Sequence, residues 1–211
     1  MPSRFFVTGT DTGVGKTVVS ATLCAALDAM YWKPVQTGTR EGTDRATVMR
    51  IAGLPRIRTA PEVYRFAPPV SPHLAARLAG EKIQLRKIDL PKIAPDENLI
   101  AEGAGGVFVP LNETDLTTAL MKRLKLPVLL VSRTSLGTIN HTLLSIAALR
   151  TARLDLHGVI MVGKANVENR KAIEHYGQVR VIGRLPFLPR LDRNTLIKAF
   201  NSHFDRTALC G

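Results

Sequence analysis

The sequence predicts an α/β fold of three layers, in which a mostly parallel sheet is covered by helices on both faces. Short apolar runs alternate along the chain with segments of helical spacing. The runs are apolar at successive residues, as expected of strands buried on both faces. The chain has 211 residues and no linker-like stretch, so we expect one domain over residues 1–211.

The strands are predicted from runs rich in apolar or β-branched residues. They are residues 4–8, 31–35, 98–101, 128–132, 156–162 and 179–182. Helical patterns follow residue 17 and cover residues 45–52, 115–124, 138–153, 167–176 and, as a closing helix, 192–204. The proline-rich residues 55–72 are interpreted as an ordered surface connection. Because ligands bind at the carboxyl ends of parallel strands, we expect the residues that follow the strands to lie together.

The sequence GTDTGVGKT, residues 9–17, joins the first predicted strand to the first predicted helix. A loop that enters a helix presents unpaired N–H groups to one spot, which suits a phosphate. Glycines at positions 9, 13 and 15 let the backbone fold around the anion, Lys16 can reach the outer phosphates, and the Thr17 hydroxyl can ligate Mg²⁺. The match to G-x-x-x-x-G-K-[ST] is a variant, because Thr10 stands where the first glycine is usual. We predict a nucleoside triphosphate site.

Polar residues follow the second and third predicted strands. Asp44 and Glu102, together with Thr17, could complete an oxygen shell for Mg²⁺. The alternative for Asp44 is a helix N-cap ahead of residues 45–52. Lys33 could extend its ammonium to the surface. Its place beside Pro34, in a segment that should border the phosphates, favours a role in stabilising charge.

The composition is strongly basic: 29 Lys and Arg stand against 17 Asp and Glu, for a formal net charge of +12. Such an excess can attract nucleic acid, membranes or small anions. The basic residues are scattered with few aromatics among them, which favours a solvated surface and no nucleic-acid partner.

Cellular location is interpreted from the apolar runs and the cysteines. The longest apolar run, residues 126–131, is too short to cross a bilayer, so no membrane partner is expected. Residues 1–4 lack the features of a signal peptide, and the two cysteines, Cys24 and Cys210, do not suggest a disulfide framework. We therefore expect a cytoplasmic protein.

Five motifs, in order between residues 4 and 190, together resemble the dethiobiotin synthetase family. They are the phosphate loop, KPVQTG at 33–38, SPH at 71–73, EGAGG at 102–106 and LGTINH at 136–141. The resemblance implies a P-loop NTPase-type fold and a ligase that uses ATP with Mg²⁺. Such an enzyme closes a cyclic urea on 7,8-diaminononanoate with CO₂ or bicarbonate as the carbon source, and it releases ADP and phosphate.

The resemblance also implies roles for individual residues. Lys33 and Lys16 would be catalytic, with Lys33 facing a carbamate and the γ-phosphate. The nucleotide would be held by Thr12, Gly13, Val14, Gly15, Lys16 and Thr17, and the metal by Thr17, Asp44 and Glu102. Thr12 and Thr37 would line the diamine site, while Leu136, Gly137 and Asn140 of a neighbouring subunit would hold the substrate's carboxylate. A symmetric homodimer is implied.

The chain departs from the family pattern at the residues that would contact the nucleobase. Where the family often has an asparagine and an aspartate, and the asparagine reads adenine, this chain has Val162-Gly163-Lys164. Backbone groups around Gly183 and Pro186 could still contact a base. We therefore expect triphosphate use with a loosened preference for adenine. The short link before Tyr31 is a second departure, and it should leave the site residues in register.

The competing hypothesis is a nucleotide-dependent dimeric switch or partitioning ATPase that binds DNA through its basic surface. The charge of +12 favours it. The loop does not, because such proteins typically carry a lysine where this chain has Asp11. A related amide-forming ligase is a further alternative, but it usually carries a glutamine-hydrolysing domain.

Overall fold

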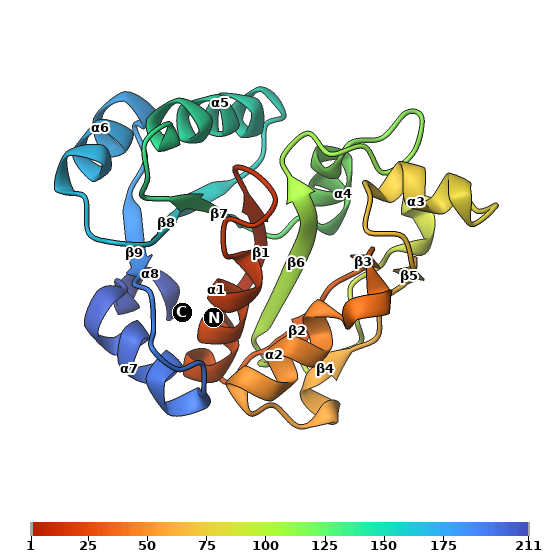
Figure 1. Cartoon of the computed structure of the whole chain (residues 1–211), viewed down its shortest axis with the longest axis horizontal. Coiled ribbons are helices and arrows are strands. Elements are labelled where there is room, and N and C mark those ends of the chain that lie inside the picture. The colour runs from red at the N-terminus through yellow and green to blue at the C-terminus, as the bar shows by residue number, and fades with distance from the viewer. Residues whose placement is uncertain (1, 211) are drawn as a thin grey trace.

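The computed structural model describes residues 2–210 and contains a central seven-stranded sheet (Figure 1). Its strand order is β4-β2-β6-β1-β7-β8-β9, and every neighbouring pair is parallel. The strands are β1 (Arg4–Gly9), β2 (Met30–Trp32), β4 (Thr59–Ala60), β6 (Leu99–Gly106), β7 (Val128–Arg133), β8 (Leu156–Val162) and β9 (Val181–Leu185). A separate parallel pair joins β3 (Val35–Gln36) to β5 (Tyr64–Arg65). The predicted α/β fold is confirmed.

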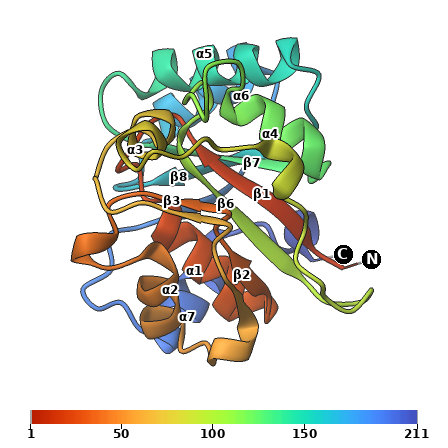
Figure 2. The same cartoon turned by 90° about the vertical axis from the view of Figure 1, so that its right-hand side faces the viewer.

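Helices cover both faces of the sheet (Figure 2). One face carries α1 (Lys16–Leu27), α2 (Asp44–Ala52) and α7 (Arg193–His203), and the other carries α4 (Thr117–Leu124), α5 (Thr138–Thr151) and α6 (Val167–Gly177). Shorter elements are α3 (Pro72–Leu78), α8 (Arg206–Leu209) and the 3₁₀ turns η1 (Thr39–Glu41), η2 (Arg56–Arg58) and η3 (Leu85–Lys87). Each face has its own hydrophobic core, as a buried parallel sheet requires. Within residues 2–210, no helix combines the length and the apolar character needed to span a membrane.

The prediction of one strand over residues 31–35 is wrong. The main-sheet strand β2 ends at Trp32, and the chain then enters the small sheet as β3. Pro34 lies at this break, where it cannot donate a ladder hydrogen bond. Its carbonyl oxygen instead accepts from the N–H groups of Val63 and Tyr64. The interpretation of residues 55–72 as a connection is likewise incomplete, because two-residue strands β4 and β5 form within it.

The third predicted strand is longer than expected, since β6 continues to Gly106 and contains Glu102 rather than preceding it. Glycines make this extension possible because β6 lies very close to β1. A Cβ on Gly103 would come within 2.9 Å of Phe6 Cε1, and one on Gly106 would lie 3.4 Å from the Gly9 carbonyl oxygen. Val7 pairs with Glu102 in the register. The acidic side chain is therefore fixed at the level where β1 enters the phosphate loop.

Candidate functional site

The loop between β1 and α1 is shaped to hold an anion. Gly13 and Gly15 have positive φ angles of 70° and 102°, which glycine adopts without strain. No side chain within residues 2–210 caps the first turn of α1, so its N–H groups are available to a ligand. The early glycine of the variant motif has a packing reason, because a Cβ on Gly9 would lie 2.7 Å from Val14 Cγ2.

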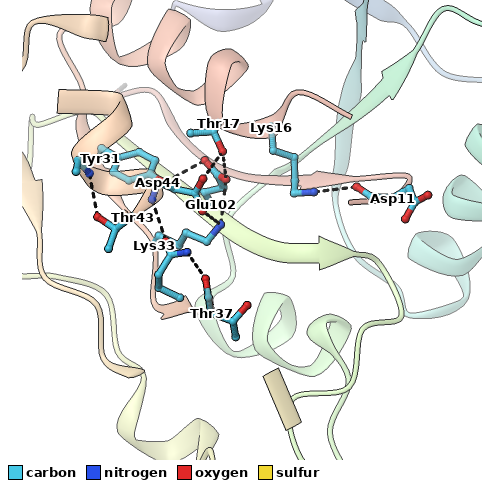
Figure 3. A network of polar contacts seen from close by, with 11 residues as sticks. Asp11, Lys16, Thr17, Tyr31, Lys33, Thr37, Thr43, Asp44 and Glu102 are labelled. Carbon is cyan, nitrogen blue, oxygen red and sulfur yellow. Dashed lines mark hydrogen bonds and ion pairs between the residues drawn. The ribbon is translucent and has the colours of Figure 1, made fainter. Parts of the chain in front are cut away.

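Lys16 is the first residue of α1 and directly follows this loop. Its Nζ donates to the Asp11 carbonyl oxygen at 2.9 Å (Figure 3). Burial lowers the pKa of Lys16 to about 8, although the charge of Glu102 opposes the shift. A polyanion bound in the loop would stabilise the charged ammonium, so Lys16 is suited to bind phosphate.

Thr17, Asp44 and Glu102 converge from α1, α2 and β6 (Figure 3). Thr17 Oγ1 lies 2.8 Å from Asp44 Oδ1 and 3.0 Å from Glu102 Oε1. A hydroxyl has one proton, so Thr17 can donate to only one ionised carboxylate at a time. Hard oxygen atoms gathered in this way are the donors that Mg²⁺ prefers. The chemistry of these side chains is compatible with a magnesium ion, and their role as its ligands stays a prediction.

Lys33 is buried between the same two carboxylates. Its Nζ lies 2.6 Å from Asp44 Oδ2 and 3.2 Å from Glu102 Oε1, and its side chain is only 8% exposed. The surface alternative for Lys33 is therefore wrong. Burial alone would lower the pKa of Lys33, but the charges of Glu102 and Asp44 outweigh burial and raise it. Burial would raise the pKa of Asp44, but the ammonium of Lys33 outweighs that effect and lowers it. Lys33 thus stays cationic at neutral pH.

Asp44 begins α2 rather than capping it. The N-cap is Thr43, whose hydroxyl accepts from the N–H of Ala46 at 3.1 Å, so the alternative role for Asp44 is wrong. The backbone N–H of Asp44 instead donates to Gln36 Oε1 at 3.1 Å. Because Thr43 occupies the cap position, the Asp44 side chain is free to face Thr17 and Lys33.

Sequence reasoning missed Tyr31, which contacts one of the two carboxylates, that of Glu102. Its hydroxyl lies 3.0 Å from Glu102 Oε2, and its side chain is completely buried. A signal was present, because Tyr31 precedes Lys33 by two residues and side chains two apart share a face of a strand. Gln36 carried no comparable signal, because its approach to Asp44 depends on the break after β2.

The phosphate loop separates two cavities, and Gly13, Gly15 and Val18 line both. We call the first the carboxylate cavity; it has a volume of about 590 Å³. Its polar lining includes Thr12, Lys16, Thr17, Lys33, Thr37, Asp44 and Glu102. Pro69, Val70, Pro72 and Val109 complete an apolar wall. The carboxylate cavity can therefore accept a ligand that has both charged and aliphatic parts.

The second, which we call the apolar cavity, has a volume of about 560 Å³. Its lining includes Val18, Val162, Pro186, Phe187, Leu188 and Leu191. Arg133, at the end of β7, also lines it, and its Nη2 lies 3.4 Å from the carbonyl oxygens of Thr12 and Gly13. Asn166 reaches this cavity too, but its side-chain oxygen accepts from the N–H of Asn169 at 2.9 Å and caps α6. Thr134, Ser135 and Lys164 also line the cavity, so a planar group can pack against its apolar walls beside several polar groups.

Four predicted site residues line neither cavity: Gly183, Leu136, Gly137 and Asn140. Gly183 lies in β9, where an added Cβ would meet Phe204 Cδ1 at 2.5 Å, so this glycine is required for packing. The other three lie at or just before the start of α5, where Leu136 is fully exposed and Gly137 occupies the N-cap position. The structure thus brings the loop, the acidic pair, Lys33, Thr37 and Pro186 together around the two cavities.

Comparisons with known proteins agree with this geometry. A family model described as an AAA domain matches residues 3–195. The ATP-dependent dethiobiotin synthetase BioD of Nitrobacter hamburgensis is 48% identical over 204 residues, covering 97% of this chain and 95% of its own length. The protein of the same name from Agrobacterium fabrum is 47% identical over 205 residues, covering 97% and 96%.

Solved structures support the fold. A ParA family ATPase from Chlorobium tepidum TLS superimposes with a TM-score of 0.56, covering 99% of this chain and 96% of its own. The two sequences are 11% identical, so this likeness concerns the fold alone.

Proposed function

Because this chain belongs to the ATP-dependent dethiobiotin synthetase family, we propose that its two adjoining cavities form one active site for that reaction. The chain is an ATP-dependent ligase that forms C–N bonds, and the resemblance carried by its five motifs is confirmed. The observation that supports the active site is the phosphate loop lying between a cavity with a buried ammonium and two carboxylates and a cavity with apolar walls. These two environments suit the diamine with its triphosphate and the nucleobase, respectively.

The proposed chemistry proceeds in three steps. One amine of 7,8-diaminononanoate adds CO₂ and loses a proton, which gives a carbamate. A carbamate oxygen then attacks the γ-phosphorus of ATP, and ADP leaves. The second amine attacks the carbon of the resulting carbamic-phosphoric anhydride, closes the cyclic urea and expels phosphate. Because each step moves negative charge, the protein acts mainly by positioning the reactants and by offsetting charge.

The residues divide this work between them. Residues 12–17 bind the phosphates, with Lys16 contributing its charge, and Thr12 and Thr37 line the diamine site. Thr17, Asp44 and Glu102 would hold Mg²⁺, which would neutralise charge on the phosphates. Lys33 borders the same cavity, and its flexible stem allows the ammonium to face the carbamate and the γ-phosphate. The base lies in the apolar cavity near Pro186.

The substrate's carboxylate tail is proposed to bind across a homodimer interface, at Leu136, Gly137 and Asn140 of the other subunit. Three features support this. These residues lie outside both cavities, Leu136 is fully exposed, and no side chain in the described part of the chain caps the start of α5. The N–H of Thr138 donates to the Ser135 carbonyl oxygen, and the N–H groups of Ile139 and Asn140 are the ones that suit a carboxylate.

We place the enzyme in the cytoplasm, without nucleic acid or membrane as partners. The relatives that are 47–48% identical favour the ligase over the DNA-binding switch. The likeness to a ParA family ATPase does not favour the switch, because it rests on 11% identity.

The first prediction tests the function itself. With ATP, Mg²⁺ and bicarbonate, phosphate release should depend on 7,8-diaminononanoate, and mass spectrometry should detect the cyclic urea. Release without that product, or release stimulated by DNA, would contradict the ligase assignment and support the switch.

Replacing Lys33 by glutamine should lower kcat by about 100-fold or more, because it removes a charge placed where negative charge develops. Nucleotide binding, measured with a fluorescent ATP analogue, should be mostly retained. Lys171→Gln is the matched control, since that lysine is exposed on α6 and pairs with Glu168. Loss of nucleotide binding in the Lys33→Gln variant would place Lys33 in the phosphate site instead.

ATP, CTP and GTP should give turnover rates within about tenfold of one another, because largely apolar walls make few hydrogen bonds to the base edges by which nucleotides differ. Steady-state rates with each nucleotide at saturating diamine provide the measurement. A strict requirement for ATP would show that this chain reads adenine by some other group.

Analytical ultracentrifugation should give a mass of twice the chain mass of 23.0 kDa, as expected of a dimer. Asn140→Ala should raise the KM for the diamine by about tenfold, as expected when a hydrogen bond to a charged group is removed, without changing the affinity for ATP. A fully active monomer would exclude this arrangement.

A further inference from the structure

We propose that Tyr31 is a positioning residue that fixes which carboxylate oxygen of Glu102 faces the carboxylate cavity. The inference rests on the proposed function, in which Glu102 is a ligand of Mg²⁺. Its starting observation is the buried contact between the Tyr31 hydroxyl and Glu102 Oε2 at 3.0 Å, visible in Figure 3 beside the contacts of Thr17 and Lys33.

The strand register brings the two side chains together. Tyr31 of β2 pairs with Ile100 of β6, and Trp32 pairs with Ala101. Glu102 lies two residues beyond Ile100, and side chains two apart on a strand point to the same face. Tyr31 and Ile100 both pack into the core beneath α1, so Glu102 is a diagonal neighbour of Tyr31 on that face. The contact therefore follows from the sheet and does not depend on a loop.

Because of this contact, the two carboxylate oxygens of Glu102 have different partners. A phenol is protonated at neutral pH, so the Tyr31 hydroxyl donates to Oε2. The other oxygen, Oε1, faces Thr17 Oγ1 at 3.0 Å and Lys33 Nζ at 3.2 Å. Glu102 is only 1% exposed, so water cannot readily replace either partner. With Oε2 turned toward Tyr31, Glu102 presents Oε1 to Thr17, where the proposed metal would bind.

Removing the hydroxyl would free the carboxylate to rotate. The last torsion of a glutamate side chain has a broad energy minimum, so the group depends on its partners for orientation. Tyr31 is the only partner of Oε2 that the structure shows within residues 2–210. Groups that orient a metal ligand in this way typically change metal affinity by about 10- to 100-fold when they are removed.

Tyr31→Phe is the direct test, and Mn²⁺ serves as the metal probe. Electron paramagnetic resonance, in the presence of a non-hydrolysable ATP analogue, should give an Mn²⁺ dissociation constant about tenfold higher for the variant than for the wild type. Turnover of the variant should recover at saturating Mg²⁺, which a purely structural defect would not allow.

Tyr64→Phe is the matched control. Tyr64 is also a buried tyrosine, and its hydroxyl accepts from the N–H of Gln84 at 3.0 Å. The same chemical change there should leave Mn²⁺ affinity unchanged. Equal Mn²⁺ affinity in wild type and Tyr31→Phe would overturn the positioning role while leaving the ligase assignment intact. Absence of Mn²⁺ binding to the wild type would contradict the proposed metal site, and the role of Tyr31 with it.

A measurement on the wild-type sequence covers the case in which Tyr31→Phe does not fold. The chain has three tyrosines, so incorporation of 3-fluorotyrosine gives three ¹⁹F resonances. The Tyr64→Phe and Tyr176→Phe variants assign two of them and leave Tyr31 by elimination. The Tyr31 resonance should shift when Mg²⁺ is added to the complex with the ATP analogue. An unchanged Tyr31 resonance would overturn the proposal.

Discussion

A buried ammonium group that contacts two carboxylates, the buried Glu102 and the partly exposed Asp44, is the interaction on which this site depends. Lys33 contacts both Asp44 and Glu102, and Thr17 contacts the same two side chains. The contacts join the end of β2 to the beginnings of α1 and α2 and to the middle of β6. Removing one partner from a buried ion pair leaves an uncompensated charge, which typically costs about 3–5 kcal/mol. The elements around the phosphate loop are therefore held together by the same charges that the reaction is proposed to use.

The segment from Tyr31 to Gln36 supports both carboxylates. Tyr31 reaches Glu102 from β2, and Lys33 reaches it from the position directly after that strand. Gln36 reaches the backbone of Asp44 because the chain leaves the main sheet before Pro34. A regular strand over residues 31–35, as the sequence predicted, would have kept Val35 rather than Gln36 on the face of Lys33. The break thus adds a contact that uninterrupted strand geometry would not provide.

Sequence patterns were sufficient to locate the site residues that lie at the ends of the predicted strands. The loop, Glu102 and Lys33 all lie near the carboxyl ends of central parallel strands, where ligands bind in such folds, and the long apolar runs identified those strands. The same reasoning could not find β3 and β5, because two residues carry no periodicity. Nor could it show that Gly183, which it placed near the base, packs against the ring of Phe204, a tertiary contact with a residue 21 positions later that no local pattern records.

The four carboxylate oxygens of Asp44 and Glu102 face different partners, and this arrangement would allow Lys33 and a metal to contact the same two residues. Asp44 presents Oδ1 to Thr17 and Oδ2 to Lys33, so it can serve a metal beside Thr17 and keep its lysine. Glu102 presents Oε1 to both, since Oε2 contacts Tyr31. A divalent cation bound through Oε1 would therefore weaken the contact between Lys33 and Glu102 while leaving the one with Asp44. The ammonium would stay tethered on one side and gain freedom on the other, toward the cavity where the proposed transfer of charge takes place.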